Sequence, residues 1–213
     1  MEKNVTYKLG FWSSVYNSIL GAVYLLILIF YFSTEGLNLP PSSFVQLASG
    51  IITFLIVPGL VVLFTSIRYV HGEDYKVFGS LGISFIILFA ATVSINRFVQ
   101  LTVIQQSLPD IPSDLTRFLP YASGSVMLAL EVLGWGVFSS LAAVFVAPLF
   151  SGSSINVAIR WLFILYAVFS FLSAFSFLTN ILIPTGPIAW GPILMALSIL
   201  LSVYFHNHNK QAT

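Results

Sequence analysis

Cysteine is absent from this sequence of 213 residues, and charged side chains make up only 7% of it. The missing cysteine excludes disulfides, thiolate nucleophiles and cysteine-ligated metal sites. Soluble domains carry about a quarter charged residues, so this chain could not cover itself with a polar surface in water. The hydrophobic content of 58% instead indicates that a lipid bilayer surrounds the protein.

Several catalytic and binding motifs are missing as well. The sequence has no glycine-rich phosphate loop, and no serine has His and Asp residues in a triad-like arrangement. The net charge of +1, without a basic patch, argues against a nucleic-acid partner. His206 and His208 alternate along the C-terminal tail without a third ligand nearby, so we expect neither a metal site nor a cofactor.

Long apolar runs, separated by proline, glycine or charged segments, predict membrane-spanning helices. The first run is too long for a signal-peptide core, and we expect it to be retained. The expected fold is all-α: a polytopic membrane protein whose six transmembrane helices form one bundle and a single domain. These helices cover about residues 11–32, 43–67, 77–106, 121–150, 161–183 and 188–205.

Basic residues are divided unequally between the two sets of connecting segments. One set comprises both tails and the connections between the second and third and between the fourth and fifth expected helices. It holds Lys3, Lys8, Arg68, Lys76, Arg160 and Lys210, whereas the remaining connections hold only Arg117. Cytoplasmic loops of membrane proteins are enriched in lysine and arginine. Both termini are therefore predicted to be cytoplasmic, in a multi-pass protein of the cell (plasma) membrane.

Three polar residues lie at one depth when residues are counted along the expected helices. Asn96, Glu131 and Asn180 are each nineteen residues, or about 28 Å, from the cytoplasmic end of their helix. This distance places all three near the outer edge of the hydrocarbon core.

Arg97 and Glu131 are the strongly ionisable residues inside apolar segments at this depth. A lone charge in the membrane costs about 2.5 to 3.5 kcal/mol, so opposite charges at one level favour pairing. We predict an Arg97–Glu131 ion pair, with Asn96, Gln100 and Asn180 supplying further hydrogen bonds. In one alternative Arg97 snorkels to the headgroups, and in another the pair only fixes the register of two helices.

Two short stretches carry a resemblance: INRFVQLTVI at 95–104 and ALEVLGW at 129–135. They resemble a pattern in uncharacterised bacterial multi-helix membrane proteins, known only as domains of unknown function. That pattern pairs Asn-aromatic-x-x-Gln-Leu with Ala-Leu-Glu-x-x-Gly-aromatic, and Arg97 stands where an aromatic residue is usual. The resemblance implies a multi-helix membrane fold and no particular activity. The matching residues are Asn96, Gln100, Glu131, Gly134 and Trp135.

Three functions fit these observations, and we expect the first, binding, rather than catalysis. It is the binding or transport of a small molecule or lipid in a polar site near the outer leaflet. Membrane lipids are the expected partners, and the oligomeric state is left open. The predicted ligand-binding residues are Asn96, Arg97, Gln100, Glu131, Trp135 and Asn180.

The other two functions use the same helices differently. An intramembrane enzyme acting on a lipid-like substrate would employ Glu131 as general acid or base, although no second carboxylate lies at this depth. A structural subunit would instead pack a partner protein against small residues of the helix at 161–183. Those small residues are Ser170, Ser173, Ala174 and Ser176.

Overall fold

A computed structural model describes residues 3–36, 41–107, 112–119, 124–179 and 185–211. These residues confirm the predicted fold class, because they form six helices long and apolar enough to cross a membrane. The first three spans are α1 (Lys3–Thr34), α2 (Ser43–Val70) and α3 (Lys76–Val99), which the π-helical η1 (Gln100–Ile104) extends. The fourth comprises α4 (Val126–Glu131), the π-helical η3 (Val132–Phe138), α5 (Ser139–Val146) and η4 (Ala147–Leu149). The last two are α6 (Ser154–Thr179) and the series α7 (Gly186–Ile188), π-helical η5 (Ala189–Ile193) and α8 (Leu194–Gln211).

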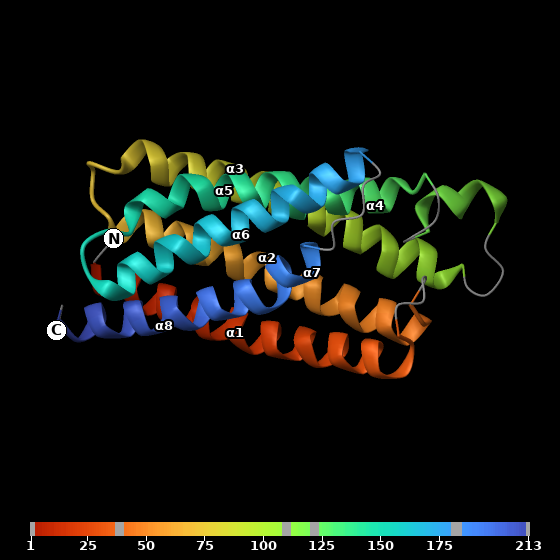
Figure 1. The fold of residues 1–213 in the computed structure, drawn as a ribbon, viewed down its shortest axis with the longest axis horizontal. Coiled ribbons are helices and arrows are strands. Elements are labelled where there is room, and N and C mark those ends of the chain that lie inside the picture. Colours follow the sequence, from red (N-terminus) through yellow and green to blue (C-terminus); the bar gives the residue numbers. More distant parts are fainter. Residues whose placement is uncertain (1–2, 37–40, 108–111, 120–123, 180–184, 212–213) are drawn as a thin grey trace.

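The six spans close into a ring. α1 packs against α2 and α8, α2 against α3, α3 against the span of α4 and α5, that span against α6, and α6 against α8. Both termini and the connection between α2 and α3 lie at the same end of the bundle (Figure 1). The short 3₁₀ helix η2 (Ser113–Phe118) lies at the opposite end.

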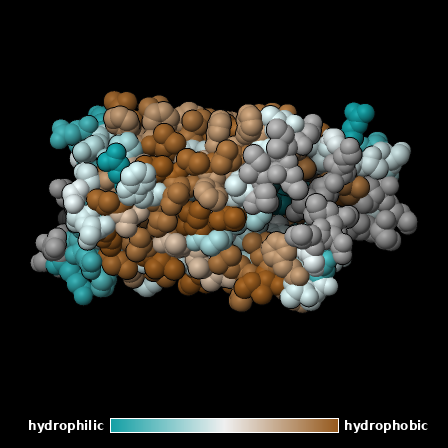
Figure 2. Space-filling model, viewed as in Figure 1, coloured by the Kyte–Doolittle hydropathy of each residue, from teal (hydrophilic) through white to brown (hydrophobic). Residues whose placement is uncertain are grey.

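The outer surface of the ring is apolar. Large hydrophobic side chains such as Leu26, Ile95 and Leu178 are exposed. Figure 2 shows hydrophobic atoms along the middle of the bundle, whereas hydrophilic atoms gather mainly toward its two ends. A surface of this kind fits hydrocarbon chains rather than water, as expected for an integral membrane protein.

Several helices are longer than the sequence suggested. α6 begins at Ser154, within the segment we expected to be a linker before residue 161, because Ser153 caps it by accepting a hydrogen bond from the Asn156 amide. α1 begins at Lys3 rather than near residue 11, and Gly10 lets it pack directly on the ring of Phe205 in α8. The N-terminal tail is therefore helical where it packs against α8, whereas the early start of α6 follows from its cap.

Pro58 lies inside α2 without ending it. A proline removes one amide donor from the helical ladder and crowds the preceding turn. The hydroxyl of Tyr16 in α1 donates to the carbonyl of Leu55 in that turn, at 2.9 Å. The adjacent Gly59 permits this approach, since a Cβ there would lie 2.6 Å from Oδ1 of Asn17. The interruption in α2 is thus stabilised by α1.

Aromatic rings surround His71 at the end of the bundle that holds the termini. Tyr204 stacks on the imidazole at a centroid distance of 5.9 Å, and Phe150 meets it edge-on at 4.8 Å. Nδ1 of His71 donates to the Ile67 carbonyl at 2.8 Å, which leaves Nε2 3.4 Å from the Tyr204 hydroxyl. Burial lowers the pKa of His71; the hydrogen bond to Ile67 opposes this, and His208 adds to it.

We expect His71 to make stability depend on pH. Because its pKa lies below the ordinary value of 6.5 only in the folded chain, the unfolded chain takes up the proton first. The contribution to stability is therefore complete above that value and decreases as the pH falls toward the folded-state pKa. When the pH is lowered from about 7 to 5, the midpoint temperature of thermal unfolding should fall by a few degrees less in His71→Phe than in wild type. His206→Phe, at an exposed position of the same end, should behave as wild type; equal pH dependence in all three proteins would contradict the assignment.

Candidate functional site

Arg97 and Glu131 form the predicted ion pair. Nη2 of Arg97 donates to Oε1 of Glu131 from α3 to α4, and the side chains are only 14% and 15% exposed. The exposure of Arg97 does not fit a side chain that snorkels to the headgroups. The two helices are therefore joined by a charge-assisted contact inside the ring.

Two amide side chains complete this contact as predicted. Nδ2 of Asn96 donates to Oε2 of Glu131 at 2.7 Å, and Nη1 of Arg97 donates to Oε1 of Gln100 at 2.6 Å. Asn96 and Gln100 are both buried. These four residues, called the polar network below, hold both charges in fixed positions.

The polar network faces a cavity in the middle of the ring. This central cavity has a volume of about 120 Å³. Since a water molecule occupies about 30 Å³ in the liquid, it has room for a small organic group. The cavity is lined mainly by polar and aromatic side chains: Tyr24, Ser49, Asn96, Arg97, Gln100, Glu131 and Trp190.

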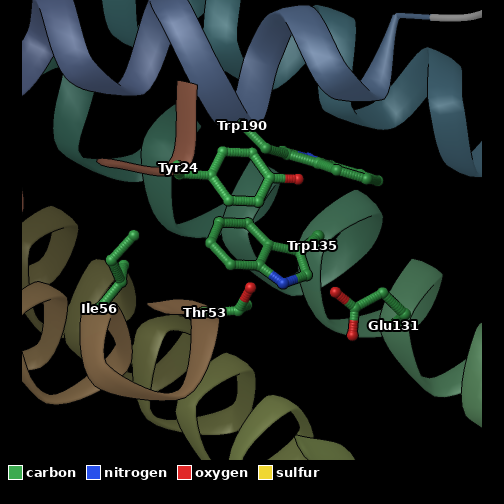
Figure 3. A pocket seen from close by; sticks show the side chains of 6 residues that line it. All are labelled: Tyr24, Thr53, Ile56, Glu131, Trp135 and Trp190. Atoms are coloured by element: carbon green, nitrogen blue, oxygen red, sulfur yellow. The ribbon is translucent and has the colours of Figure 1, made fainter. Parts of the chain in front are cut away.

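A second, smaller space adjoins the central cavity and shares three of its lining residues. This aromatic pocket has a volume of about 20 Å³ and is lined by Tyr24, Thr53, Ile56, Glu131, Trp135 and Trp190. Figure 3 shows the rings of Tyr24, Trp135 and Trp190 gathered on one side, with the Glu131 carboxylate beside the indole nitrogen of Trp135. The volume suits one water-sized group.

Hydroxyl groups bond the side chain of one tryptophan and the backbone of the other. Nε1 of Trp190 donates to Oγ of Ser170 in α6 at 3.1 Å. The Tyr166 hydroxyl, also in α6, donates to Ser139 at 2.9 Å, and Ser139 in turn donates to the carbonyl of Trp135. α6 does not border the cavity itself but positions the aromatic side chains that do.

Each of the π-helical segments contributes to this site. Gln100 comes from η1, Trp135 from η3 and Trp190 from η5. A π-bulge widens one helical turn, which redirects the side chains after it, and such bulges are frequent at functional sites. Their occurrence in three spans around one cavity favours a functional role for the cavity.

Three buried polar atoms at the site have no hydrogen-bond partner among the described residues. They are Oδ1 of Asn96, Nε of Arg97 and Nε1 of Trp135. A buried polar group without a partner costs about 1–3 kcal/mol. All three belong to residues that line the central cavity or the aromatic pocket.

The structure brings together five of the six residues we predicted for the site. Asn96, Arg97, Gln100 and Glu131 line the central cavity, and Trp135 lines the aromatic pocket. Asn180 lies outside the described residues. The described residues include no group of three His, Asp or Glu side chains placed to hold a metal ion.

Sequence reasoning missed Tyr24 and Trp190, although a usable signal was present. Each lies about twenty residues from the end of its span nearest the termini, the same count that placed Asn96 and Glu131. The count was applied to polar residues alone, so two amphipathic aromatic residues at that depth were overlooked.

Comparisons of the chain with protein-family models, with curated proteins and with solved structures found no match. The resemblance to uncharacterised bacterial membrane proteins therefore remains a prediction. Function is inferred from the geometry and chemistry of the site alone.

Proposed function

We propose that this protein binds a small polar molecule or a lipid headgroup in the central cavity. The observation that carries the proposal is the position of the polar network, which lines a cavity at the centre of the ring rather than a packed helix contact. Charged side chains inside membrane segments are costly and characteristically serve binding or transport. A purely structural pair would not need a cavity beside it.

The orientation follows from the distribution of basic residues. Arg68 and Lys76 flank the connection between α2 and α3, at the end of the bundle that also holds both termini. With that end in the cytoplasm, the polar network lies toward the outer leaflet of the cell membrane. A ligand then reaches the site from the outside or from the outer leaflet, and transport requires a further opening toward the termini.

Catalysis and partner assembly have less support. Glu131 is the only carboxylate among the described residues that line the cavity, and both of its oxygens already accept hydrogen bonds. The small residues expected to receive a partner protein instead pack within the chain. Ala174 contacts the backbone at Gly136, and Ser173 lies against Gly186.

Native mass spectrometry of protein released from gentle detergent tests the proposal. We expect a bound mass in wild type and in Glu73→Gln, whose exposed carboxylate lies in the connection between α2 and α3. The bound mass should be lost in Glu131→Gln, which removes the charge that faces the cavity.

A second variant separates loss of the ligand from loss of the fold. Ser49→Leu adds bulk at the wall of the central cavity and leaves every member of the polar network in place. We expect it to lose the bound mass while melting close to wild type. A bound mass retained in both cavity variants, or absent from wild type, would contradict the proposed function.

A further inference from the structure

The charges that line the central cavity balance each other. Arg97 and Glu131 are the only charged residues among the described residues that line it. An ion entering this space inside the bundle with a net charge would remain uncompensated, at a high desolvation cost. The cavity therefore favours a ligand with no net charge, either neutral or zwitterionic.

The two ends of the site differ in chemistry. The aromatic pocket combines the rings of Tyr24, Trp135 and Trp190 with the Glu131 carboxylate (Figure 3). Aromatic faces attract organic cations, and a carboxylate such as that of Glu131, which accepts from Asn96 and Arg97, has about four acceptor positions. This end is suited to an ammonium group.

The central cavity offers a guanidinium and amide groups. Arg97 lines the central cavity but not the aromatic pocket. Two of its donors bond Glu131 and Gln100, so the guanidinium retains donors for oxygen atoms. Guanidinium groups match the oxygens of phosphate and carboxylate.

We infer that the ligand is a zwitterion with a primary ammonium at one end and a phosphate or carboxylate at the other. The inference rests on the proposed function and adds the class of ligand. The ammonium occupies the aromatic pocket, because about 20 Å³ holds a water-sized group but not a trimethylammonium group. The anionic oxygens lie in the central cavity beside Arg97. A free zwitterion and the headgroup of an ethanolamine phospholipid share this chemistry.

Tryptophan fluorescence can report on the site directly. Trp12 and Trp161 are exposed at 65% and 59%, whereas Trp135 and Trp190 line the aromatic pocket. The double variant Trp12→Phe/Trp161→Phe therefore leaves only the two site tryptophans as reporters. We expect glycerophosphoethanolamine to change their emission in a saturable way. Glycerophosphocholine, ethanolamine and dimethyl phosphate should each half-saturate the change only at a concentration at least about tenfold higher. The first lacks the primary ammonium, the second the phosphate and the third the ammonium.

A lipid arm identifies the source of the zwitterion. Dihexanoyl-phosphatidylethanolamine, used below its micellar concentration, carries the same headgroup with short chains. Saturation at about tenfold lower concentration than glycerophosphoethanolamine would assign the site to a membrane lipid. Equal or weaker binding would assign it to a free zwitterion.

Variants of Tyr24 test the ammonium end in the same background. Tyr24→Leu removes one aromatic face and should lower the affinity for glycerophosphoethanolamine roughly 3- to 30-fold. Tyr24→Phe keeps the ring and should retain binding. Dimethyl phosphate should bind both variants equally.

The outcomes separate this inference from the proposed function. If ethanolamine or dimethyl phosphate binds as tightly as glycerophosphoethanolamine, the ligand is not a zwitterion. Suppose that no probe changes the emission, but native mass spectra still show a bound mass in wild type that is lost in Glu131→Gln. The ligand class is then wrong and the proposed function stands. If probes and adducts are both absent, both proposals fail.

Discussion

Replacing Glu131 with alanine is expected to cost about 3–5 kcal/mol of folding free energy, the largest effect of any single substitution proposed for this protein. The variant leaves the Arg97 guanidinium without its carboxylate, and Nδ2 of Asn96 loses its acceptor. An uncompensated charge inside a membrane bundle is costly, whereas the intact pair contributes little beyond balancing its own desolvation. Reversible unfolding in mixed micelles with increasing denaturing detergent measures the difference.

Two controls show whether the unpaired charge causes this loss. Glu73→Ala removes a carboxylate that is itself exposed and pairs with Lys76 at 3.1 Å and more distantly with Arg68 at 3.7 Å, and it should change stability little. The double variant Arg97→Met/Glu131→Met removes both charges and should recover most of the stability lost in Glu131→Ala. If the double variant is as unstable as Glu131→Ala, shape rather than charge determines the effect.

The ion pair also shows how far sequence reasoning reaches in a membrane protein. A bilayer has a fixed thickness and a helix a fixed rise, so counting residues from the helix ends gives depth. Depth placed Asn96 and Glu131 at one level, and the cost of burying charges brought Arg97 into the same network. The six spans followed from apolar length alone, because lipid-exposed backbone must be helical.

Other features depend on contacts between helices, which residue counting does not reveal. The π-helical segments give the same apolar pattern as ordinary helix, so neither η3 nor η5 was expected. The start of α6 at Ser154 depends on the Ser153 cap within a small polar segment that resembles a linker. Trp190 was overlooked because an aromatic residue in an apolar run usually packs against other apolar side chains and has no further role. Its role follows from its position beside Tyr24 and Glu131.

α6 connects these features. Ser170 holds Trp190, Tyr166 holds Ser139 beneath Trp135, and Ala174 lies against η3 at Gly136. The spacing between α6 and η3 therefore sets the separation of the two tryptophans, whose rings lie 5.9 Å apart. A side chain inserted between these helices should alter both stability and the aromatic pocket.

Gly136→Ala tests this spacing, with Gly50→Ala as its matched control. A Cβ at Gly136 would lie 2.7 Å from Cβ of Ala174 and 3.3 Å from the Ser170 carbonyl, atoms that cannot move without their helix. We expect a loss of about 1–3 kcal/mol, and a larger loss for Gly136→Leu, measured by the same detergent unfolding. A Cβ at Gly50 meets the flexible side chain of Leu101 at 3.4 Å and Oε1 of Gln100 at 3.9 Å, both ordinary or nearly ordinary contacts, so Gly50→Ala should be neutral or slightly stabilising.

Emission from Trp135 and Trp190 separates the two effects of Gly136→Ala. In the Trp12→Phe/Trp161→Phe background, displacement of α6 should shift the emission of the folded variant, because Ser170 would draw Trp190 away from Trp135. Gly50→Ala lies on α2, outside this chain of contacts, and should leave the emission unchanged. A destabilised Gly136→Ala with wild-type emission would mean that α6 stabilises the bundle without positioning the tryptophans. A shifted emission together with weakened binding of glycerophosphoethanolamine would mean that a contact remote from the cavity determines its shape.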